Sequence, residues 1–267
     1  MRLSGAWGKN HRNVRIVFIG AGNLATHLSK ALKDAGFEIV QVYSRTESSA
    51  SRLAGALHVP YTTHVSHIIA HASLYIISVS DDVIGSIAEQ LPLTNGMVVH
   101  TAGSVPMSIL SGKHANYGVL YPLQTFSGIR AVDFSGIPVF LEANTPNNLQ
   151  LLRDLAGTIS NRVYDAVSEE RRQLHVAAVF GCNFVNHLYY LAAQIAQQAG
   201  FDFEVLSPLI LETAYKAVAS GNPQDVQTGP AVRGDREVMR KHMELLAALL
   251  QWQEIYTMLS KSIEKTV

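Results

Sequence analysis

Residues 20–25 have the types and spacing of a phosphate-binding turn. The stretch Gly20-Ala21-Gly22-Asn23-Leu24-Ala25 follows an apolar run, residues 14–19. In this spacing the first glycine permits a tight strand-to-helix turn, the second lets a pyrophosphate approach the backbone, and a small third residue lets the helix pack close to the sheet. A turn without a ligand also needs glycine, so the motif alone leaves both interpretations open. The predicted cofactor contacts here are Gly20, Gly22, Asn23, Leu24 and Ala25.

The residues after the next predicted strand favour a phosphorylated dinucleotide. A cofactor without a 2′-phosphate usually meets Asp or Glu at this place, which bonds the ribose hydroxyls. This chain instead has Ser44, Arg45 and Thr46 after residues 38–43, and the nearest acid is Glu47. A guanidinium offers phosphate a planar pair of donors, and the two hydroxyls add to it. We therefore predict NADP (NADPH) rather than NAD; the alternative is a solvated arginine at the start of a helix.

Short polar segments follow the later predicted strands, where the ligands of parallel sheets bind. Residues 78–82 and 100–104 suit a backbone that runs past a ribose and nicotinamide, and residues 121–126 are expected to line the cleft. Each segment alone also fits an ordinary loop. The predicted cofactor contacts are Val79, Ser80, Thr101, Ala102 and Gly103, and the predicted substrate-lining residues are Tyr121, Pro122 and Gln124.

A histidine and an asparagine on a long helical pattern are candidates for the chemistry. His175 and Asn183 lie eight residues apart, about two turns, within residues 171–200. A histidine that titrates near neutral pH suits general acid–base work. A lone helical histidine is usually a packing residue, and that alternative stays open. The apolar neighbours favour a used or hydrogen-bonded pair, because burying an unsatisfied polar group is costly.

A glycine-containing loop, residues 228–235, supplies the third catalytic candidate. Arg233 is suited to clamp a substrate carboxylate, and Gly229 and Pro230 are predicted to line the substrate. Asp235 is a good N-cap for the helix that follows, and Arg233 paired with that aspartate is the alternative.

The elements that carry these residues change in type along the chain. Up to about residue 160, strand-like and helix-like patterns alternate, which predicts an α/β, Rossmann-type domain with a mostly parallel sheet. Later residues give long helical patterns and almost no strand signal. We expect a flexible leader (1–13), a dinucleotide-binding domain (14–160) and an all-helical C-terminal domain (161–267).

The long helical pattern is apolar on most of its faces. Such a helix needs partners all round, so we predict a homodimer formed through the C-terminal helices. Complete burial of this helix within one monomer is the alternative.

Composition excludes several classes of protein. The 267 residues contain 21 Lys and Arg and 21 Asp and Glu, without the basic excess of a nucleic-acid binder. The longest apolar runs are far shorter than the roughly 20 residues of a membrane span, and no signal peptide is recognisable. A single cysteine, Cys182, excludes an internal disulfide. The scattered histidines lack carboxylates at ligand spacing, so we predict no metal site. A cytoplasmic protein with a small-molecule substrate is expected, without nucleic acid or membrane as partner.

Three spaced motifs resemble a bacterial Rossmann-like NADP-binding family whose helical C-terminal domain has no assigned function. They are Tyr/His-Pro-Leu-Gln-Thr-Phe at Tyr121–Phe126, His-x-Ala-Ala-x-Phe-x-x-Asn-Phe at His175–Phe184, and Gly-Pro-x-x-Arg-Gly-Asp at Gly229–Asp235. The resemblance runs from Arg15 to the C-terminus. The turn and the Ser-Arg-Thr segment also resemble pyrroline-5-carboxylate reductase, a distant relative, within a superfamily that includes 6-phosphogluconate and 3-hydroxyisobutyrate dehydrogenases. The resemblance implies an NADP-dependent oxidoreductase with a helical dimerisation domain.

Two departures keep the activities of these relatives from being transferred. The hydroxyacid dehydrogenases carry a catalytic lysine one turn before an asparagine on the long helix, where this chain has Val179 and Phe180. The Ser/Thr-rich substrate loop of pyrroline-5-carboxylate reductase is matched only partly by residues 227–230. We expect reduction of a small carbonyl or imine bound between the two domains. The alternative is a non-catalytic NADP-binding sensor or scaffold, which the missing lysine supports.

Overall fold

The computed structural model describes residues 14–128 and 132–266. The leader expected at residues 1–13 lies outside the described residues. The chain divides into two compact units, Met1–Cys182 and Asn183–Val267, and each is described by itself.

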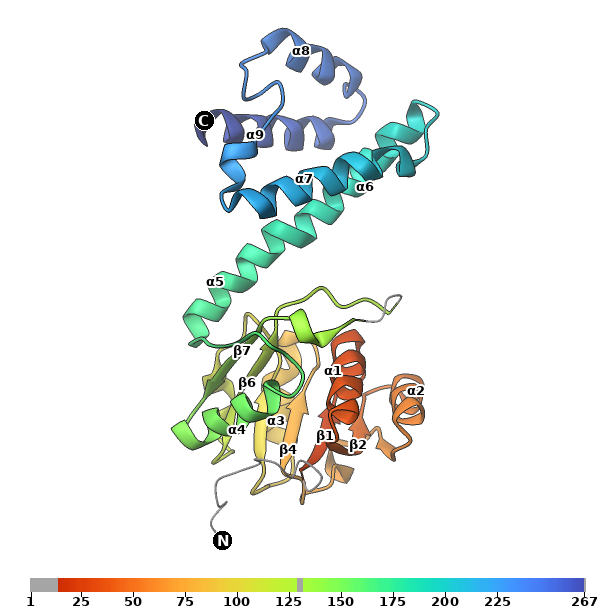
Figure 1. Ribbon diagram of the computed structural model, residues 1–267. Coiled ribbons are helices and arrows are strands. Elements are labelled where there is room, and N and C mark those ends of the chain that lie inside the picture. Colours follow the sequence, from red (N-terminus) through yellow and green to blue (C-terminus); the bar gives the residue numbers. More distant parts are fainter. Residues whose placement is uncertain (1–13, 129–131, 267) are drawn as a thin grey trace. The chain divides into compact units, whose positions relative to one another are not determined.

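The first unit is built on a sheet of eight strands in the order β3-β2-β1-β4-β5-β6-β7-β8 (Figure 1). Neighbouring strands are parallel except for the antiparallel pair of β6 and β7. The mostly parallel sheet predicted from the sequence is therefore confirmed. The strands are β1 (Arg15–Ile19), β2 (Glu38–Tyr43), β3 (Tyr61–Thr62), β4 (Leu74–Ile77), β5 (Met97–His100), β6 (Tyr117–Pro122), β7 (Val139–Ala143) and β8 (Val163–Asp165).

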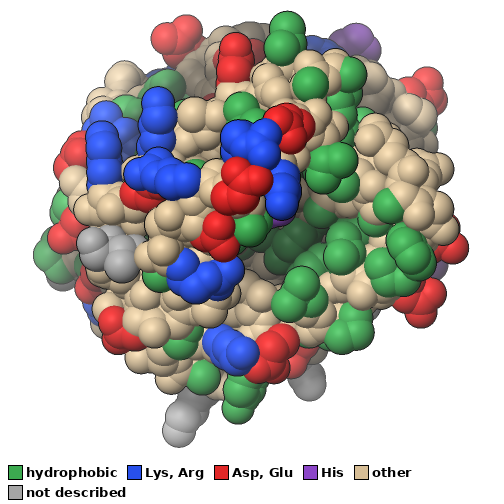
Figure 2. All heavy atoms as spheres, turned by 90° about the horizontal axis from the view of Figure 1, so that it is seen from above, with side chains coloured by type: hydrophobic (Ala, Val, Ile, Leu, Met, Phe, Trp, Pro, Cys, Tyr) green, Lys and Arg blue, Asp and Glu red, His purple; other side chains and the backbone are tan. Residues whose placement is uncertain are grey.

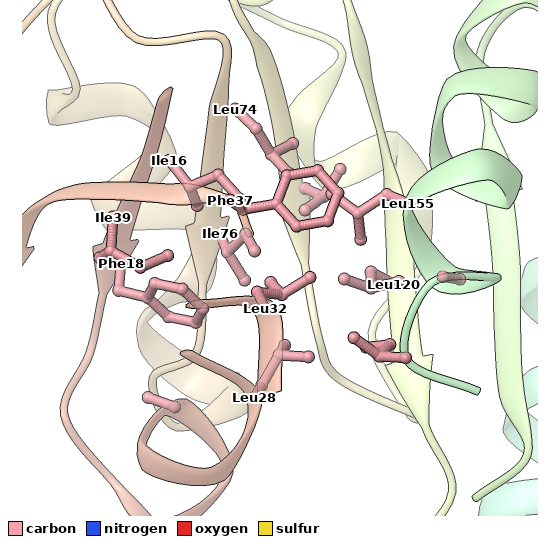
Figure 3. Close-up of a cluster of buried hydrophobic side chains, with 14 of the residues drawn as sticks. Ile16, Phe18, Leu28, Leu32, Phe37, Ile39, Leu74, Ile76, Leu120 and Leu155 are labelled. Atoms are coloured by element: carbon pink, nitrogen blue, oxygen red, sulfur yellow. The ribbon is translucent and has the colours of Figure 1, made fainter. Parts of the chain in front are cut away.

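Both faces of this sheet are covered, which explains the continuous apolar run of β1. Ile16 and Phe18 point into one buried cluster, and Val17 and Ile19 point into the other. Figure 3 shows the first cluster, where Leu28 and Leu32 of α1 and Leu155 of α4 lie against the strands. The helices that pack on the sheet are α1 (Asn23–Asp34), α2 (Glu47–Leu57), α3 (Ile84–Gln90) and α4 (Pro146–Ala156).

The sheet extends past the boundary that the sequence suggested at residue 160. Strand β8 pairs in parallel with β7 and includes the exposed residues Tyr164 and Asp165. A short edge strand with exposed side chains lacks the apolar pattern of a buried strand, so the sequence does not predict it. The long helical region begins after β8, at Ser168.

The predicted long helix runs from Ser168 to Gln198, as α5 (Ser168–Ala178), a π-helical segment (Val179–Phe184) and α6 (Val185–Gln198). In the part of the chain that the structure describes, it is the one helix long and apolar enough to cross a membrane by length and composition alone. This differs from the expectation that no segment reaches that length. The expectation counted unbroken apolar runs, whereas this helix mixes apolar residues with small and uncharged polar ones. Because only 6% of its apolar window is buried, the helix presents much of this surface outward.

The second unit is helical, as predicted, and buries little of itself. Besides α6 it contains α7 (Ser207–Ser220), α8 (Arg236–Leu245) and α9 (Leu250–Thr266). Among its described residues, only Leu191, Ala231, Leu246 and Ser260 are buried. Large apolar side chains of α7 are open to solvent, with Val218 84% exposed and Tyr215 72% exposed. Hydrophobic side chains gather on one side of the face drawn in Figure 2, and charged ones gather on the other.

Candidate functional site

A cavity of about 710 Å³ lies at the carboxyl ends of β1, β2 and β4. This is the edge where parallel sheets bind their ligands. The predicted cofactor contacts that line it are Gly20, Gly22, Asn23, Leu24, Ser44, Arg45, Thr46, Val79 and Ser80. The structure therefore brings together the phosphate-binding turn, the Ser-Arg-Thr segment and the residues that follow β4.

The two glycines of the turn have different structural requirements. Gly20 has φ +116°, and a Cβ there would lie 2.1 Å from the carbonyl oxygen of Ser78, so the fold itself demands glycine. At Gly22 a Cβ would meet nothing within 4 Å, and φ is −76°. Gly22 is the N-cap of α1, and no side chain caps the helix there. The amides of a helix's first turn lack partners within the helix, so this helix start, with room beside Gly22, suits a pyrophosphate. Ala25, the third residue of the motif, is fully buried, as close helix packing requires.

Arg45 lines the cavity with an exposed side chain and, in the described parts of the chain, without a hydrogen-bond or ion-pair partner. The neighbouring carboxylate of Glu47 instead accepts a hydrogen bond of 3.2 Å from the hydroxyl of Tyr61. This contact raises the pKa of Tyr61. The guanidinium is thus available to a phosphate, together with the hydroxyls of Ser44 and Thr46 and that of Ser49, which the sequence analysis missed.

The loop after β5 is held by two buried side chains. The amide of Ala102 donates to Nδ1 of His100 at 3.2 Å. The carbonyl of Ala102 accepts from Nε of Arg171, also at 3.2 Å. Arg171 also donates to the carbonyl of Val105 at 2.6 Å. Next to this loop, the hydroxyls of Thr101 and Ser78 lie 3.0 Å apart. The predicted contacts Thr101, Ala102 and Gly103 therefore lie on a backbone fixed from both sides.

Arg171 is 1% exposed and forms an ion pair with Glu142 of β7. Ser168 donates to the same carboxylate at 2.7 Å. Burial, together with the charge of Arg171, lowers the pKa of His100 to about 3, so this imidazole is neutral at physiological pH. Neither His100, Arg171 nor Glu142 was predicted from the sequence. Because their partners are distant in sequence, no local sequence pattern predicts the roles of these three residues.

Tyr121 and His175 form a hydrogen-bonded pair beside the same loop. The phenol oxygen lies 3.0 Å from Nδ1 of His175, and the rings meet edge to face. A Cβ on Gly103 would lie 2.7 Å from that Nδ1, so only glycine lets the loop approach the pair this closely. Burial raises the pKa of Tyr121 to about 12, so the hydroxyl keeps its proton. The structure thus joins three predicted residues: Gly103, Tyr121 and His175.

Two further predicted substrate-lining residues, Pro122 and Gln124, follow Tyr121 within three residues. Pro122 ends β6, and the exposed Gln124 accepts a hydrogen bond from the amide of Thr125 at 2.8 Å. Asn183, Gly229, Pro230 and Arg233 belong to the second unit and are described within it.

Within the second unit, the loop at residues 228–235 leads into α8. Asp235 caps that helix, because its carboxylate accepts from the amide of Val238 at 3.2 Å. No Arg233–Asp235 ion pair occurs in this described segment, so the alternative role suggested for Arg233 is not observed. Over residues 14–128 and 132–266, no group of three or more His, Cys, Asp and Glu side chains is arranged to hold a metal ion.

Two family models match the chain. The model described as "NADP oxidoreductase coenzyme F420-dependent" matches residues 15–102, and the "Domain of unknown function (DUF2520)" matches residues 137–263. A search of the curated proteins finds no match.

Among solved structures, a "putative NADP oxidoreductase" from Bacteroides fragilis is 47% identical to the chain. The match covers 96% of this chain and 99% of that chain, with a TM-score of 0.89. A protein from Thermotoga maritima is 22% identical over 94% of this chain and 97% of its own, with a TM-score of 0.68.

Pyrroline-5-carboxylate reductase from Streptococcus pyogenes is 14% identical over 94% of this chain and 98% of its own, with a TM-score of 0.62. At such identities, the likeness to this enzyme and to the Thermotoga protein shows a shared fold.

Proposed function

The chain belongs to the same NADP oxidoreductase family as the Bacteroides fragilis protein, and from this premise we propose that it is an NADPH-dependent reductase of a small carbonyl or imine. One arrangement carries the proposal. The carboxyl edge of the sheet holds the glycine-rich turn and Arg45 at one end, and the Tyr121–His175 pair beside a clamped loop at the other. A dinucleotide that starts at Arg45 and passes the start of α1 points its reactive ring toward that pair.

The residues present fit NADPH. The start of α1 has room beside Gly22 for the pyrophosphate, and the hydroxyls around Arg45 suit a 2′-phosphate. When bound, NADPH supplies a hydride, and the protein must orient the substrate and supply a proton.

We assign the proton to His175. Tyr121 occupies Nδ1 of this histidine, which leaves Nε2 as the ring nitrogen for the substrate. The carbon of the C=O or C=N bond takes the hydride, and the oxygen or nitrogen takes the proton. Asn183 and Arg233 stay candidates for substrate contacts, to be tested by substitution.

The choice of cofactor is tested by titration. If Arg45 binds a 2′-phosphate, NADPH binds at least tenfold more tightly than NADH. Equal dissociation constants would contradict the choice of NADP. Because the family description also mentions coenzyme F420, the same titration with that deazaflavin would show whether it competes.

The reaction is tested by following NADPH oxidation with a panel of 2-oxo acids, aldehydes and cyclic imines. At least one class should be reduced, and His175→Ala should lower that turnover about 10²-fold to 10⁴-fold without weakening NADPH binding. NADPH binding without turnover across the panel would favour a non-catalytic sensor. A ligand retained through purification, identified by mass spectrometry, would name the substrate class directly.

We propose further that the protein is a homodimer formed through its C-terminal helices. The exposed apolar side chains of α7 and the nearly coreless second unit support this. Light scattering should give twice the mass of one chain. The exposed Cys182 is the one cysteine of the chain, which suits the reducing cytoplasm that we propose as its location.

A further inference from the structure

The segment that follows β6 is attached to the first two turns of α1. The side chain of Asn23 donates to the carbonyl of Phe126 at 3.2 Å, and Nε2 of His27 lies 2.8 Å from the carbonyl oxygen of Ser127. The rings of His27 and Phe126 stack with centroids 5.6 Å apart. Asn23 and His27 are four residues apart, so one face of α1 makes all of these contacts.

This attachment forces the segment across the carboxyl edge of the sheet. The order β1-β4-β5-β6 separates β6 from β1 by three strand spacings, about 14 Å. Residues 122–126 bend at Gln124, whose amide donates to the carbonyl of Pro122 at 3.1 Å, and the segment reaches α1 at Phe126. Figure 1 shows the chain after β6 running along this end of the sheet toward α1.

The segment is also held by apolar packing on the α1 side of the sheet. Phe126 packs against the buried cluster on the α1 side of the sheet, and its ring stacks on Phe134 with centroids 5.7 Å apart. The polar Gln124 and Thr125 stay exposed at the edge, where Gln124 accepts hydrogen bonds from Thr125. The position of the segment is therefore set at its far end by one stacked ring and two side chains of α1.

The segment lies outside the cavity described above. That cavity extends from Arg45 to the start of α1 and the residues after β4, and none of residues 122–127 lines it. A dinucleotide that fills the cavity continues past Asn23 toward the loop at Thr101–Gly103. The segment runs between these two places, from Tyr121 to the start of α1.

We propose that residues 122–127 form one wall of the nicotinamide half of the cofactor site, and that Asn23 and His27 are the positioning residues that hold this wall in place. The inference rests on the proposed function only in requiring that NADPH binds at this edge. It gives the Asn23 side chain a role in holding this wall, beyond the cofactor contact predicted for this residue.

The experiment compares two ligands with the full chain. NADPH occupies both halves of the site, whereas adenosine 2′,5′-bisphosphate occupies only the half at Arg45. His27→Ala should raise the dissociation constant of NADPH about fivefold, as expected for one lost hydrogen bond, and leave that of the bisphosphate unchanged. His27→Gln keeps a donor for the Ser127 carbonyl and should restore most of the affinity.

Lys30→Gln is the matched control, because Lys30 is an exposed residue of the same helix without a contact to the wall in the described structure. It should change neither constant. Equal weakening of both ligands by His27→Ala would overturn the proposal, since the substitution would then act on the helix start. An unchanged NADPH constant would overturn it as well. A wild-type protein that binds the bisphosphate but not NADPH would contradict the proposed function and this inference together.

Discussion

At the Arg45 end of the proposed cofactor site, the binding residues are neighbours in sequence, whereas at the Tyr121 end the residues come from four different elements. Gly20–Ala25 and Ser44–Thr46 are two short segments at the ends of adjacent strands. Contacts between residues 29 to 69 positions apart hold the Tyr121 end together. They join Tyr121 to His175, and Arg171 to Glu142 and to the loop after β5. The first end depends on backbone geometry, and the second depends on buried side chains.

This difference suggests that the two ends can be disturbed separately. A substitution at Arg45 should leave the clamped loop intact, and a substitution at Arg171 should leave the phosphate turn intact. The predictions below test this independence, beginning with the largest expected effect.

Replacing the buried arginine should cause the largest loss. Arg171→Met leaves Glu142 without its cation and two loop carbonyls without their donor, and should lower the free energy of unfolding by about 3–5 kcal/mol. Denaturant unfolding measures this. The neighbouring Arg172→Met removes only an exposed pair with Glu169 and should cost less than about 1 kcal/mol. Similar losses in both variants would contradict the role given to the buried clamp.

Acidic pH should lower the free energy of unfolding because of His100, which lies at the Tyr121 end. The unfolded chain binds a proton at this residue with a pKa near 6.5, whereas burial lowers the pKa of the folded His100 to about 3. Between these values the unfolded state binds more protons, so stability falls as the pH falls. The loss from pH 6 to pH 4 should be about 2–3 kcal/mol.

The control for this pH effect is His100→Asn, which keeps an acceptor for the amide of Ala102 but does not titrate. Its unfolding free energy should depend less steeply on pH over the same range. If the wild type and the variant show the same slope, His100 is not the group responsible.

Removing the cation at the Arg45 end should weaken binding without loss of stability. Arg45→Ala should raise the dissociation constant of NADPH about tenfold to hundredfold, because hydrogen bonds from a charged donor are lost, and should leave NADH binding unchanged. Isothermal titration measures both. Arg52→Ala, in the helix that follows Arg45 and with an exposed side chain, should alter neither constant. A parallel loss of NADH affinity would mean that Arg45 does not distinguish the 2′-phosphate.

The smallest effect is expected at Tyr121. Tyr121→Phe keeps the ring packing and removes one hydrogen bond to His175, worth about 1 kcal/mol. Turnover should fall about fivefold, and the NADPH dissociation constant should stay the same in steady-state and binding assays. Unchanged turnover would remove Tyr121 from the positioning of His175.

The same contrast determines what could be predicted from the sequence. The strand and helix alternation and the Gly-rich turn are local patterns, since each residue's role follows from its neighbours. They gave the fold class and the lining of the cavity. Arg171 escaped prediction because its partners lie on β7 and in the loop after β5, far away in sequence. His175 was proposed from its residue type, but its contact with Tyr121 depends on how α5 packs.

The role of Asn23 shows a further limit. Its place in the glycine-rich turn predicts a cofactor contact, but no local pattern predicts that its side chain also bonds the carbonyl of Phe126, 103 positions away. Similarly, β8 could not be predicted because an exposed edge strand carries no apolar signal. Tertiary contacts decide such cases, and a local pattern contains no information about them.

The two glycines of the turn should differ in which assay rejects their substitution. A library screened only for folded, soluble protein should reject nearly every substitution at Gly20, because each side chain collides with the carbonyl of Ser78. The same screen should accept alanine at Gly22, where the free protein has room. Only a second screen for cofactor binding should reject it. Within one short loop, folding therefore requires glycine at position 20, whereas cofactor binding requires it at position 22.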